Sequence, residues 1–485
     1  MRGRAVRHKE IGRIEMRAPA KAAVWYFVGG AIGKAVGLIA TPIFTRLLSS
    51  EEFATLPLFM TWVGLIGAAC GVSGSLGARG KMLIEGEGRG EEISYAFFGY
   101  GIIQLLACML LYFLLYPILS RLGAPSIGLS LFVFLQLILD TAIHSQTTRL
   151  KANYGYKRAV GISIFLSVAP VVISYIIISL FGARGEYRVI GSLIAGGALA
   201  VPIIFRALKG GRLYDKAVFR ELFRTEAPLL PKNLASALLF SADRLMITAF
   251  FGFEALSAYT ISHSVGAAGG FIVTALSAAA TPWVIRRLSS GRTEGICETS
   301  DTAVLLLTLG AIMICGLAPE LLGFLAPSGY DAPLSVIAPL TLSSVPLFLS
   351  GLLSGVAASE GHGFSAAMPG VITAVLSIAL NALLFSIFSI EVAGVGYFVA
   401  NLLGLFIADA IRSRQGGERL FSKSRLTLSL FVGGALCLIA LAYDYSLAMR
   451  ATLILLAVVI SLPLLLGFLV RVGIKRPPKS GGEGV

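Results

Sequence analysis

Charged residues are scarce in this sequence. Of its 485 residues, 14% are charged and 56% are apolar, whereas a soluble domain has about 25% charged and about 45–50% apolar residues. This balance excludes an ordinary soluble protein. The net charge of +14 would suit a nucleic-acid binder, but such a protein needs a basic patch on a folded soluble domain. No soluble stretch here reaches domain size, so nucleic acid is excluded as a partner.

Cysteine pairs and enzyme signatures are also missing. The five cysteines are scattered without a CxxC pair, so neither a disulfide framework nor a zinc site is indicated. The sequence has no GxxxxGKS/T loop for ATP and no HExxH pair for a metal, and no Ser and His residues in an arrangement typical of a catalytic triad. We therefore expect a protein that is not an enzyme and holds no metal or organic cofactor.

Long apolar runs fill almost the whole chain. A helix that crosses a bilayer needs roughly 20 mostly apolar residues, and charged or Gly/Pro-rich breaks separate stretches of about that length. The runs are continuously apolar rather than alternating, which excludes a β-barrel. We therefore predict an all-α integral membrane protein with about 14 transmembrane helices. The predicted spans are 22–45, 55–76, 94–119, 126–148, 159–181, 188–205, 226–250, 255–285, 300–323, 332–358, 365–388, 392–411, 426–445 and 449–470.

The breaks between spans differ in basic charge. Cytoplasmic loops of membrane proteins carry an excess of Lys and Arg. If the N-terminus is inside, the inner segments hold 32 of the 40 cations and the outer breaks hold five. This asymmetry predicts a multi-pass protein of the inner (cytoplasmic) membrane with both termini in the cytoplasm.

The longest inner break follows the sixth span, and its sequence is typical of a short amphipathic basic helix at the membrane surface. We therefore predict two six-helix lobes followed by two further helices. The predicted parts are a basic cytoplasmic tail 1–21, an N-terminal lobe 22–205, an amphipathic linker 206–225, a C-terminal lobe 226–411, a cytoplasmic loop 412–425, helices 13 and 14 over 426–470 and a basic cytoplasmic tail 471–485.

Lys34 is the deepest cation in the predicted membrane region. It lies 12 residues into the first span, roughly 18 Å deep at about 1.5 Å per residue. An ionisable group at that depth is a functional hypothesis by default, because its insertion costs at least about 2.5–3.5 kcal/mol. The alternative is a structural lysine that pairs with an acid or snorkels along a cavity.

The seventh span carries Lys232, Asn233, Asp243 and Arg244. Lys232 and Asp243 are 11 residues apart, close to three helical turns, so they share one face of the helix. That face should point to protein or water rather than lipid. Since these residues lie toward the ends of the span, interfacial anchoring is the alternative.

The fourth span carries a polar stripe of Gln136, Asp140, His144 and Thr147 on one helical face. An Asp and a His within one turn can relay protons or bind a cation. The alternative is a hydrogen-bonded stripe between helices without such a role. His263, alone in the eighth span, is interpreted as a packing or hydrogen-bonding residue. Three acids near span ends are interpreted as solvated: Glu320, Glu360 and Asp409.

Three stretches resemble a known family. Residues 33–59, GKAVGLIATPIFTRLLSSEEFATLPLF, are similar to its first helix, outer turn and second helix. Residues 227–266, APLLPKNLASALLFSADRLMITAFFGFEALSAYTISHSVG, resemble its seventh helix with an Asp-Arg pair and a following outer turn. Residues 317–340, LAPELLGFLAPSGYDAPLSVIAPL, resemble the segment before span ten. The family is that of lipid-linked oligosaccharide flippases of polysaccharide biosynthesis, within the multidrug/oligosaccharidyl-lipid/polysaccharide exporter superfamily.

The resemblance implies two six-helix bundles that face each other in a V around a central cavity, two extra C-terminal helices, and alternating access. It also implies a substrate with a polyprenyl tail, a pyrophosphate and a short glycan. A pyrophosphate needs cations in a wet cavity, so four residues are substrate-binding candidates: Lys34, Lys232, Asn233 and Arg244. Candidates for coupling to H⁺ or Na⁺ are Asp140, His144 and Asp243.

We therefore expect a flippase that moves a lipid-linked oligosaccharide from the cytoplasmic to the outer leaflet for surface polysaccharide biosynthesis. Its expected partners are the substrate, membrane lipids and the polysaccharide polymerase machinery. One alternative is an ion-coupled multidrug antiporter of the same superfamily, which needs an acidic cavity. A second is a membrane glycosyltransferase or polymerase, which should carry a large outer loop with paired acids.

Overall fold

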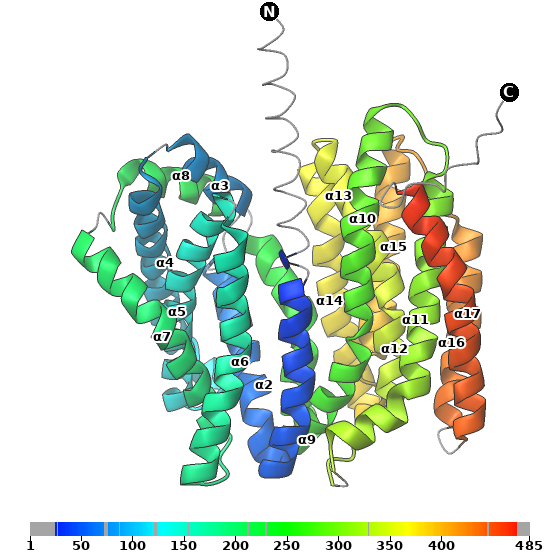
Figure 1. Cartoon of the computed structure of the whole chain (residues 1–485), viewed down its shortest axis with the longest axis horizontal. Coiled ribbons are helices and arrows are strands. Elements are labelled where there is room, and N and C mark those ends of the chain that lie inside the picture. Colours follow the sequence, from blue (N-terminus) through cyan, green and yellow to red (C-terminus); the bar gives the residue numbers. More distant parts are fainter. Residues whose placement is uncertain are drawn as a thin grey trace, which may run out of the picture. The chain divides into compact units, whose positions relative to one another are not determined.

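The structure, a computed structural model, describes residues 25–26, 28–71, 76–86, 88–120, 124–153, 155–210, 213–227, 230–327, 329–443 and 446–472. Within these ranges all regular secondary structure is helical, which confirms the predicted all-α fold class. The chain divides into two compact units, Met1–Ala237 and Leu238–Val485. The boundary falls inside the long helix α9, Leu230–Gly266, so this helix contributes to both units (Figure 1).

Unit 1 is built from long apolar helices and two short ones. Ser49 caps α2, because its hydroxyl accepts a hydrogen bond from the N–H of Glu52 at 3.4 Å, and Glu51 and Glu52 favour the helix start. Helix α2 therefore begins five residues before the predicted span. The helices are Val28–Leu47, α2 Ser50–Ala69, α3 Leu76–Glu85, α4 Gly90–Leu119, α5 Ile127–Ala152, α6 Tyr156–Phe181, α7 Glu186–Gly210 and α8 Lys216–Glu226.

Unit 2 has a helical core around α11, α10 and α13. Phe348 and Leu349 of α13 and Leu307 of α11 belong to one buried hydrophobic cluster, and α16 and α17 both pack on α11. The elements after α9 are α10 Gly269–Ser289, α11 Ile296–Leu325, η3 Leu334–Val336, α12 Ile337–Leu342, α13 Ser344–Ser359, α14 Gly363–Ile387, η4 Ile390–Val392, α15 Val395–Arg414, α16 Lys423–Ala442 and α17 Leu447–Arg471.

The described residues contain 13 segments long and apolar enough to cross a membrane. One of them, Ser241–Ser289, has 49 residues; it contains the predicted span 255–285 whole and the end of the predicted span 226–250. Each of the 14 predicted spans therefore coincides with helical structure. The structure adds α3, which lies where a break was predicted, between the second and third predicted spans.

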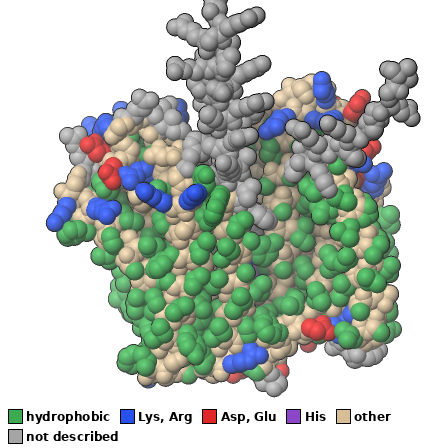
Figure 2. All heavy atoms as spheres, viewed as in Figure 1, with side chains coloured by type: hydrophobic (Ala, Val, Ile, Leu, Met, Phe, Trp, Pro, Cys, Tyr) green, Lys and Arg blue, Asp and Glu red, His purple; other side chains and the backbone are tan. Residues whose placement is uncertain are grey.

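Both units show a membrane-type surface. Hydrophobic side chains cover the length of the helices, and Lys, Arg, Asp and Glu gather mainly toward the ends of each unit (Figure 2). On unit 1, exposed apolar side chains include Leu110 and Leu114 of α4, at 75% and 74% exposure. A large continuous apolar surface of this kind is typical of a protein face that contacts lipid.

Helix α8 covers the second half of the predicted amphipathic linker and packs on α3 and α4. Asp215 caps it by accepting hydrogen bonds from the N–H groups of Val218 at 3.3 Å and Ala217 at 2.9 Å. These bonds, with the nearby Arg89 guanidinium, lower the pKa of Asp215. The apolar face of α8, with Leu222 fully buried, is directed to the protein.

A buried ion pair fixes the end of α8. The guanidinium of Arg79 on α3 donates two hydrogen bonds to the carboxylate of Glu226, from Nε at 2.7 Å and from Nη2 at 2.9 Å. The two side chains are 2% and 3% exposed. Arg79 also lies over the ring of Phe97, 5.5 Å from its centroid. Removing one partner of an ion pair buried to this extent strongly destabilises the folded protein, because the remaining charge stays buried without compensation.

Close backbone approach also requires a glycine on α4. A Cβ atom at Gly99 would lie 2.0 Å from the carbonyl oxygen of Leu213, just before α8. We expect Gly99→Ala to destabilise unit 1 by about 1–3 kcal/mol, the usual cost of overpacking, and to increase hydrogen exchange in α8. Gly161→Ala on α6 is the control, because a Cβ there meets nothing within 4 Å. Equal melting temperatures of the two variants would contradict this prediction.

Candidate functional site

A buried carboxylate lies at the centre of a polar cluster in unit 2. Asp243 of α9 is 5% exposed. Its Oδ2 accepts a hydrogen bond from the hydroxyl of Tyr259, and its Oδ1 accepts one from the backbone N–H of Arg244 at 2.8 Å. Both carboxylate oxygens are therefore bound to uncharged donors.

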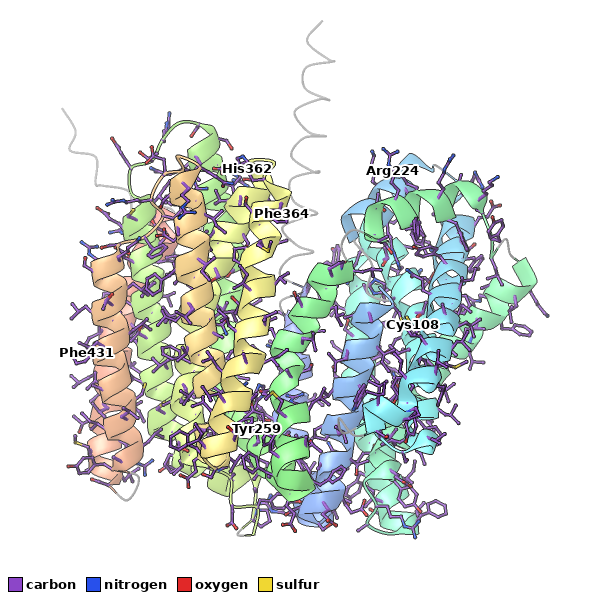
Figure 3. The ribbon with its side chains drawn as sticks, turned by 180° about the vertical axis from the view of Figure 1, so that it is seen from behind. Cys108, Arg224, Tyr259, His362, Phe364 and Phe431 are labelled. Atoms are coloured by element: carbon purple, nitrogen blue, oxygen red, sulfur yellow. The ribbon has the colours of Figure 1, made fainter. Side chains whose placement is uncertain are left out.

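The local fold of α9 brings these residues together. Gly252 has φ +85° and ψ −173°, a conformation that only glycine adopts readily, and it interrupts the helix. Tyr259, labelled in Figure 3, lies on the second part of α9 and is fully buried. His263 lies one turn further along the same helical face. The break at Gly252 thus allows the second part of α9 to place both side chains against Asp243 and Arg244.

The guanidinium of Arg244 has few partners. Its Nη2 lies 3.5 Å from Nδ1 of His263, and its buried Nε has no hydrogen-bond partner among the described residues. No ion pair of Arg244 occurs in the described part of the chain, although Asp243 is adjacent in sequence. His263, predicted to have a packing or hydrogen-bonding role, contacts Arg244 on one side and the ring of Tyr259 on the other, at 5.5 Å between centroids.

A small cavity of about 130 Å³ adjoins this cluster. Asp243, His263 and Tyr397 of α15 line it, with Ser343 and Ser344. Ser344 is 4% exposed and its hydroxyl has no hydrogen-bond partner among the described residues. Since a water molecule occupies about 30 Å³ of liquid, the cavity has room for a few waters.

The predicted polar stripe of α5 forms part of unit 1. The side-chain amide of Gln136, 7% exposed, donates a hydrogen bond to Oδ1 of Asp140 at 2.9 Å. His144 is half-buried, and its Nε2 has no hydrogen-bond partner among the described residues. Asp140 is therefore bound to the residue one turn before it. The four-residue spacing of the two side chains accounts for this contact within one helix.

The other candidate substrate-binding residues lie in unit 1. Lys34 is exposed near the middle of the helix Val28–Leu47. Asn233 is half-buried in the first part of α9, and the side chain of its neighbour Lys232 lies outside the described residues. Arg244 belongs to unit 2. The site residues predicted from the sequence are therefore divided between the two units.

The three acids interpreted as solvated are all in ion pairs. The Arg450 guanidinium lies 2.5 Å from Glu320, Arg412 lies 2.9 Å from Glu360, and Lys423 lies 2.7 Å from Asp409. Asp409 is only 7% exposed, so the solvated interpretation is wrong for it. Each pair joins residues of two different helices or their ends, which the position of each acid near a span end could not indicate.

Sequence reasoning did not select Tyr259 and Tyr397. The spacing of Tyr259 and His263 by four residues places them on one helical face and could have suggested a shared role. Nothing in the local sequence links Tyr397 of α15 to Asp243, because its position depends on helix packing. Within the described residues, no group of three or more His, Cys, Asp or Glu side chains could hold a metal ion.

Solved structures share this fold. Lipid II flippase MurJ in an inward closed conformation matches with a TM-score of 0.70 and 12% identity, over 93% of this chain and all of that chain. A multidrug resistance MATE family transporter of the MOP superfamily, in an inward-facing conformation, has a TM-score of 0.56, 15% identity, and coverage of 79% and 95%. The MATE transporter VcmN of Vibrio cholerae has a TM-score of 0.52, 17% identity, and coverage of 82% and 97%.

These likenesses show that the chain shares the fold of these proteins. A comparison with curated proteins finds no sequence match. The polysaccharide biosynthesis protein family matches residues 20–287. Because this match spans more than half of the sequence, the chain belongs to the polysaccharide biosynthesis protein family.

Proposed function

We propose that this protein is a flippase that moves a polyprenyl-diphosphate-linked oligosaccharide from the cytoplasmic to the outer leaflet by alternating access. The observation that carries the proposal is the guanidinium of Arg244, which contacts His263 but no carboxylate among the described residues. A cation within a predicted membrane span is costly unless an anion accompanies it. The diphosphate of a lipid-linked substrate supplies such an anion.

The family and the fold support this proposal, since the family is one of polysaccharide biosynthesis and one structure of the same fold is a lipid II flippase. Lys34, Lys232, Asn233 and Arg244 are the proposed binding residues for the head group. Lys and Arg bind phosphate oxygens through charge-assisted hydrogen bonds. A glycan polymerase is a further proposed partner, because surface polysaccharide synthesis requires an enzyme that joins the translocated oligosaccharides. The charge asymmetry of the loops supports an inner-membrane protein with both termini in the cytoplasm.

Asp140, His144 and Asp243 are the proposed coupling residues for a driving ion, H⁺ or Na⁺. Two of them, Asp140 and Asp243, already accept hydrogen bonds from neutral donors. A multidrug antiporter for cationic compounds requires free carboxylates as ligands. The engagement of both oxygens of Asp243 therefore favours an anionic substrate over a cationic drug. A membrane glycosyltransferase would need paired acids in an extramembrane site, and the described residues offer no such loop.

Translocation of a fluorescent polyprenyl-diphosphate oligosaccharide in reconstituted vesicles tests the proposal. Accessibility of the glycan to an added lectin reports its arrival in the outer leaflet. Vesicles that show no translocation above protein-free vesicles would reject the flippase. Efflux of cationic dyes in the same vesicles would instead support the antiporter.

Lys34→Ala tests the first candidate cation. We expect export in cells to fall by about tenfold or more, because a hydrogen bond to a charged group contributes about 1.5–3 kcal/mol. Lys216→Ala on α8 is the control, since it removes an exposed lysine outside the predicted spans. Normal export by Lys34→Ala at normal protein levels would show that Lys34 does not bind the substrate.

A further inference from the structure

The contact between Arg244 and His263 depends on the protonation state of the imidazole. The guanidinium of Arg244 can only donate hydrogen bonds, so Nδ1 of His263, 3.5 Å from Nη2, must accept. A neutral imidazole has one accepting nitrogen, whereas a protonated ring has N–H groups at both positions and accepts none. The observed arrangement therefore belongs to neutral His263.

The groups around His263 define what a proton there would change. Arg244, Tyr259 and Asp243 face it from α9, and Tyr397 lies across the cavity on α15. Among the described groups around this cavity, Asp243 is the acid, and its two oxygens already accept from Tyr259 and from the Arg244 backbone. With one carboxylate and one guanidinium, the cluster is neutral overall. A proton on His263 would place a second cation beside Arg244 and leave the cluster with one positive charge.

A bound anion would neutralise the extra positive charge that a protonated His263 places beside Arg244. We propose that binding of the substrate diphosphate at Arg244 is coupled to protonation of His263, an inference that rests on the proposed function. One proton from water adds to Nδ1, and the hydrogen bond from Arg244 Nη2 to Nδ1 breaks. The guanidinium and the new Nδ1–H then both donate to phosphate oxygens. Because linkage is reciprocal, the bound anion retains the proton and the proton strengthens anion binding. Release of the diphosphate returns the proton and restores the Arg244–His263 contact.

This coupling makes diphosphate affinity depend on pH through His263. For one linked proton, affinity rises as the pH falls, by at most about tenfold per pH unit. The diphosphate itself also titrates, so the pH dependence of the native protein must be compared with a variant that binds the same ligand. His263→Gln is suited to this, because a glutamine side chain still accepts a hydrogen bond from Arg244 but takes up no proton.

Titration calorimetry of the purified full-length protein with polyprenyl diphosphate tests the coupling. Repeating the titration in buffers of different ionisation enthalpy gives the number of protons taken up per diphosphate bound. We expect uptake of up to one proton beyond that of His263→Gln, and a flatter pH dependence of affinity in that variant. His362→Gln, at the exposed residue just before α14, is the matched control and should take up as many protons as the native protein.

The outcomes separate this inference from the proposed function. If the native protein does not bind polyprenyl diphosphate, the proposed function fails, and the inference fails with it. If it binds with equal proton uptake in the native protein and in His263→Gln, the coupling is rejected while the flippase proposal stands. A loss of proton uptake in His362→Gln alone would also reject the assignment to His263.

Discussion

Replacing Arg244 by glutamine should lower the rate of lipid-linked oligosaccharide translocation by roughly 10- to 100-fold. The expected loss corresponds to about 1.5–3 kcal/mol, the contribution of a hydrogen bond to a charged group. The guanidinium of Arg244 contacts His263, and the backbone N–H of Arg244 rather than its guanidinium binds Asp243. Its positive charge is therefore available to an anion, and glutamine removes that charge while keeping a polar side chain.

A graded series sharpens this prediction. Arg244→Lys should retain part of the rate, because lysine keeps the charge but not the planar fork that binds two phosphate oxygens. Arg286→Gln, at the exposed end of α10, is a matched charge-removing control and should be close to native. Initial rates in vesicles with equal amounts of protein provide the measurement. Equal rates for Arg244→Gln and Arg286→Gln would show that Arg244 does not bind substrate.

Removing one partner of the Arg79–Glu226 pair should destabilise unit 1 by about 3–5 kcal/mol. Both side chains are almost fully buried and joined by two hydrogen bonds. In Arg79→Met, the Glu226 carboxylate stays buried without its partner. In Glu226→Leu, the Arg79 guanidinium stays buried without its partner. We expect a lower melting temperature in detergent and faster hydrogen exchange over Lys216–Glu226.

The double variant Arg79→Met with Glu226→Leu distinguishes a buried charge from lost packing. A buried pair replaced by apolar residues of similar volume is often neutral or stabilising, because neither charge must be desolvated. The double variant should therefore be more stable than either single variant. Additive losses in the double variant would mean that packing, and not the buried charge, explains the effect. Native translocation by the double variant would further show that the pair has a structural role only.

Contacts within one helix could be predicted from sequence spacing. Gln136 and Asp140 are four residues apart on one helix, and the structure joins them by a hydrogen bond. The resemblance to the family included the Asp243-Arg244 pair and the turn that follows it. It did not indicate that Tyr259 binds the carboxylate, because that contact requires the chain to reverse near Gly252 and two helical segments to pack in one register.

Contacts between different helices could not be predicted in this way. Asp409 looked solvated because it lies near a span end, yet it pairs with Lys423 from the next helix and is 7% exposed. Helix α3 was missed because charged residues interrupt its sequence, and its stability depends on tertiary contacts such as that between Arg79 and Glu226. Helix propensity is a weak signal where packing supplies most of the stability.

The sequence by itself determined that this is a membrane protein built from long apolar helices. In lipid, every backbone N–H and C=O group must form its hydrogen bond within the protein. Long apolar runs therefore fold as helices. Only the tertiary structure decided the state of each buried charge. Arg79 pairs with the carboxylate of Glu226, Asp243 accepts hydrogen bonds from neutral donors, and Arg244 contacts the imidazole of His263. These partners come from helix packing, which places side chains from separate segments within hydrogen-bond distance, and residue order along the chain does not encode that distance directly.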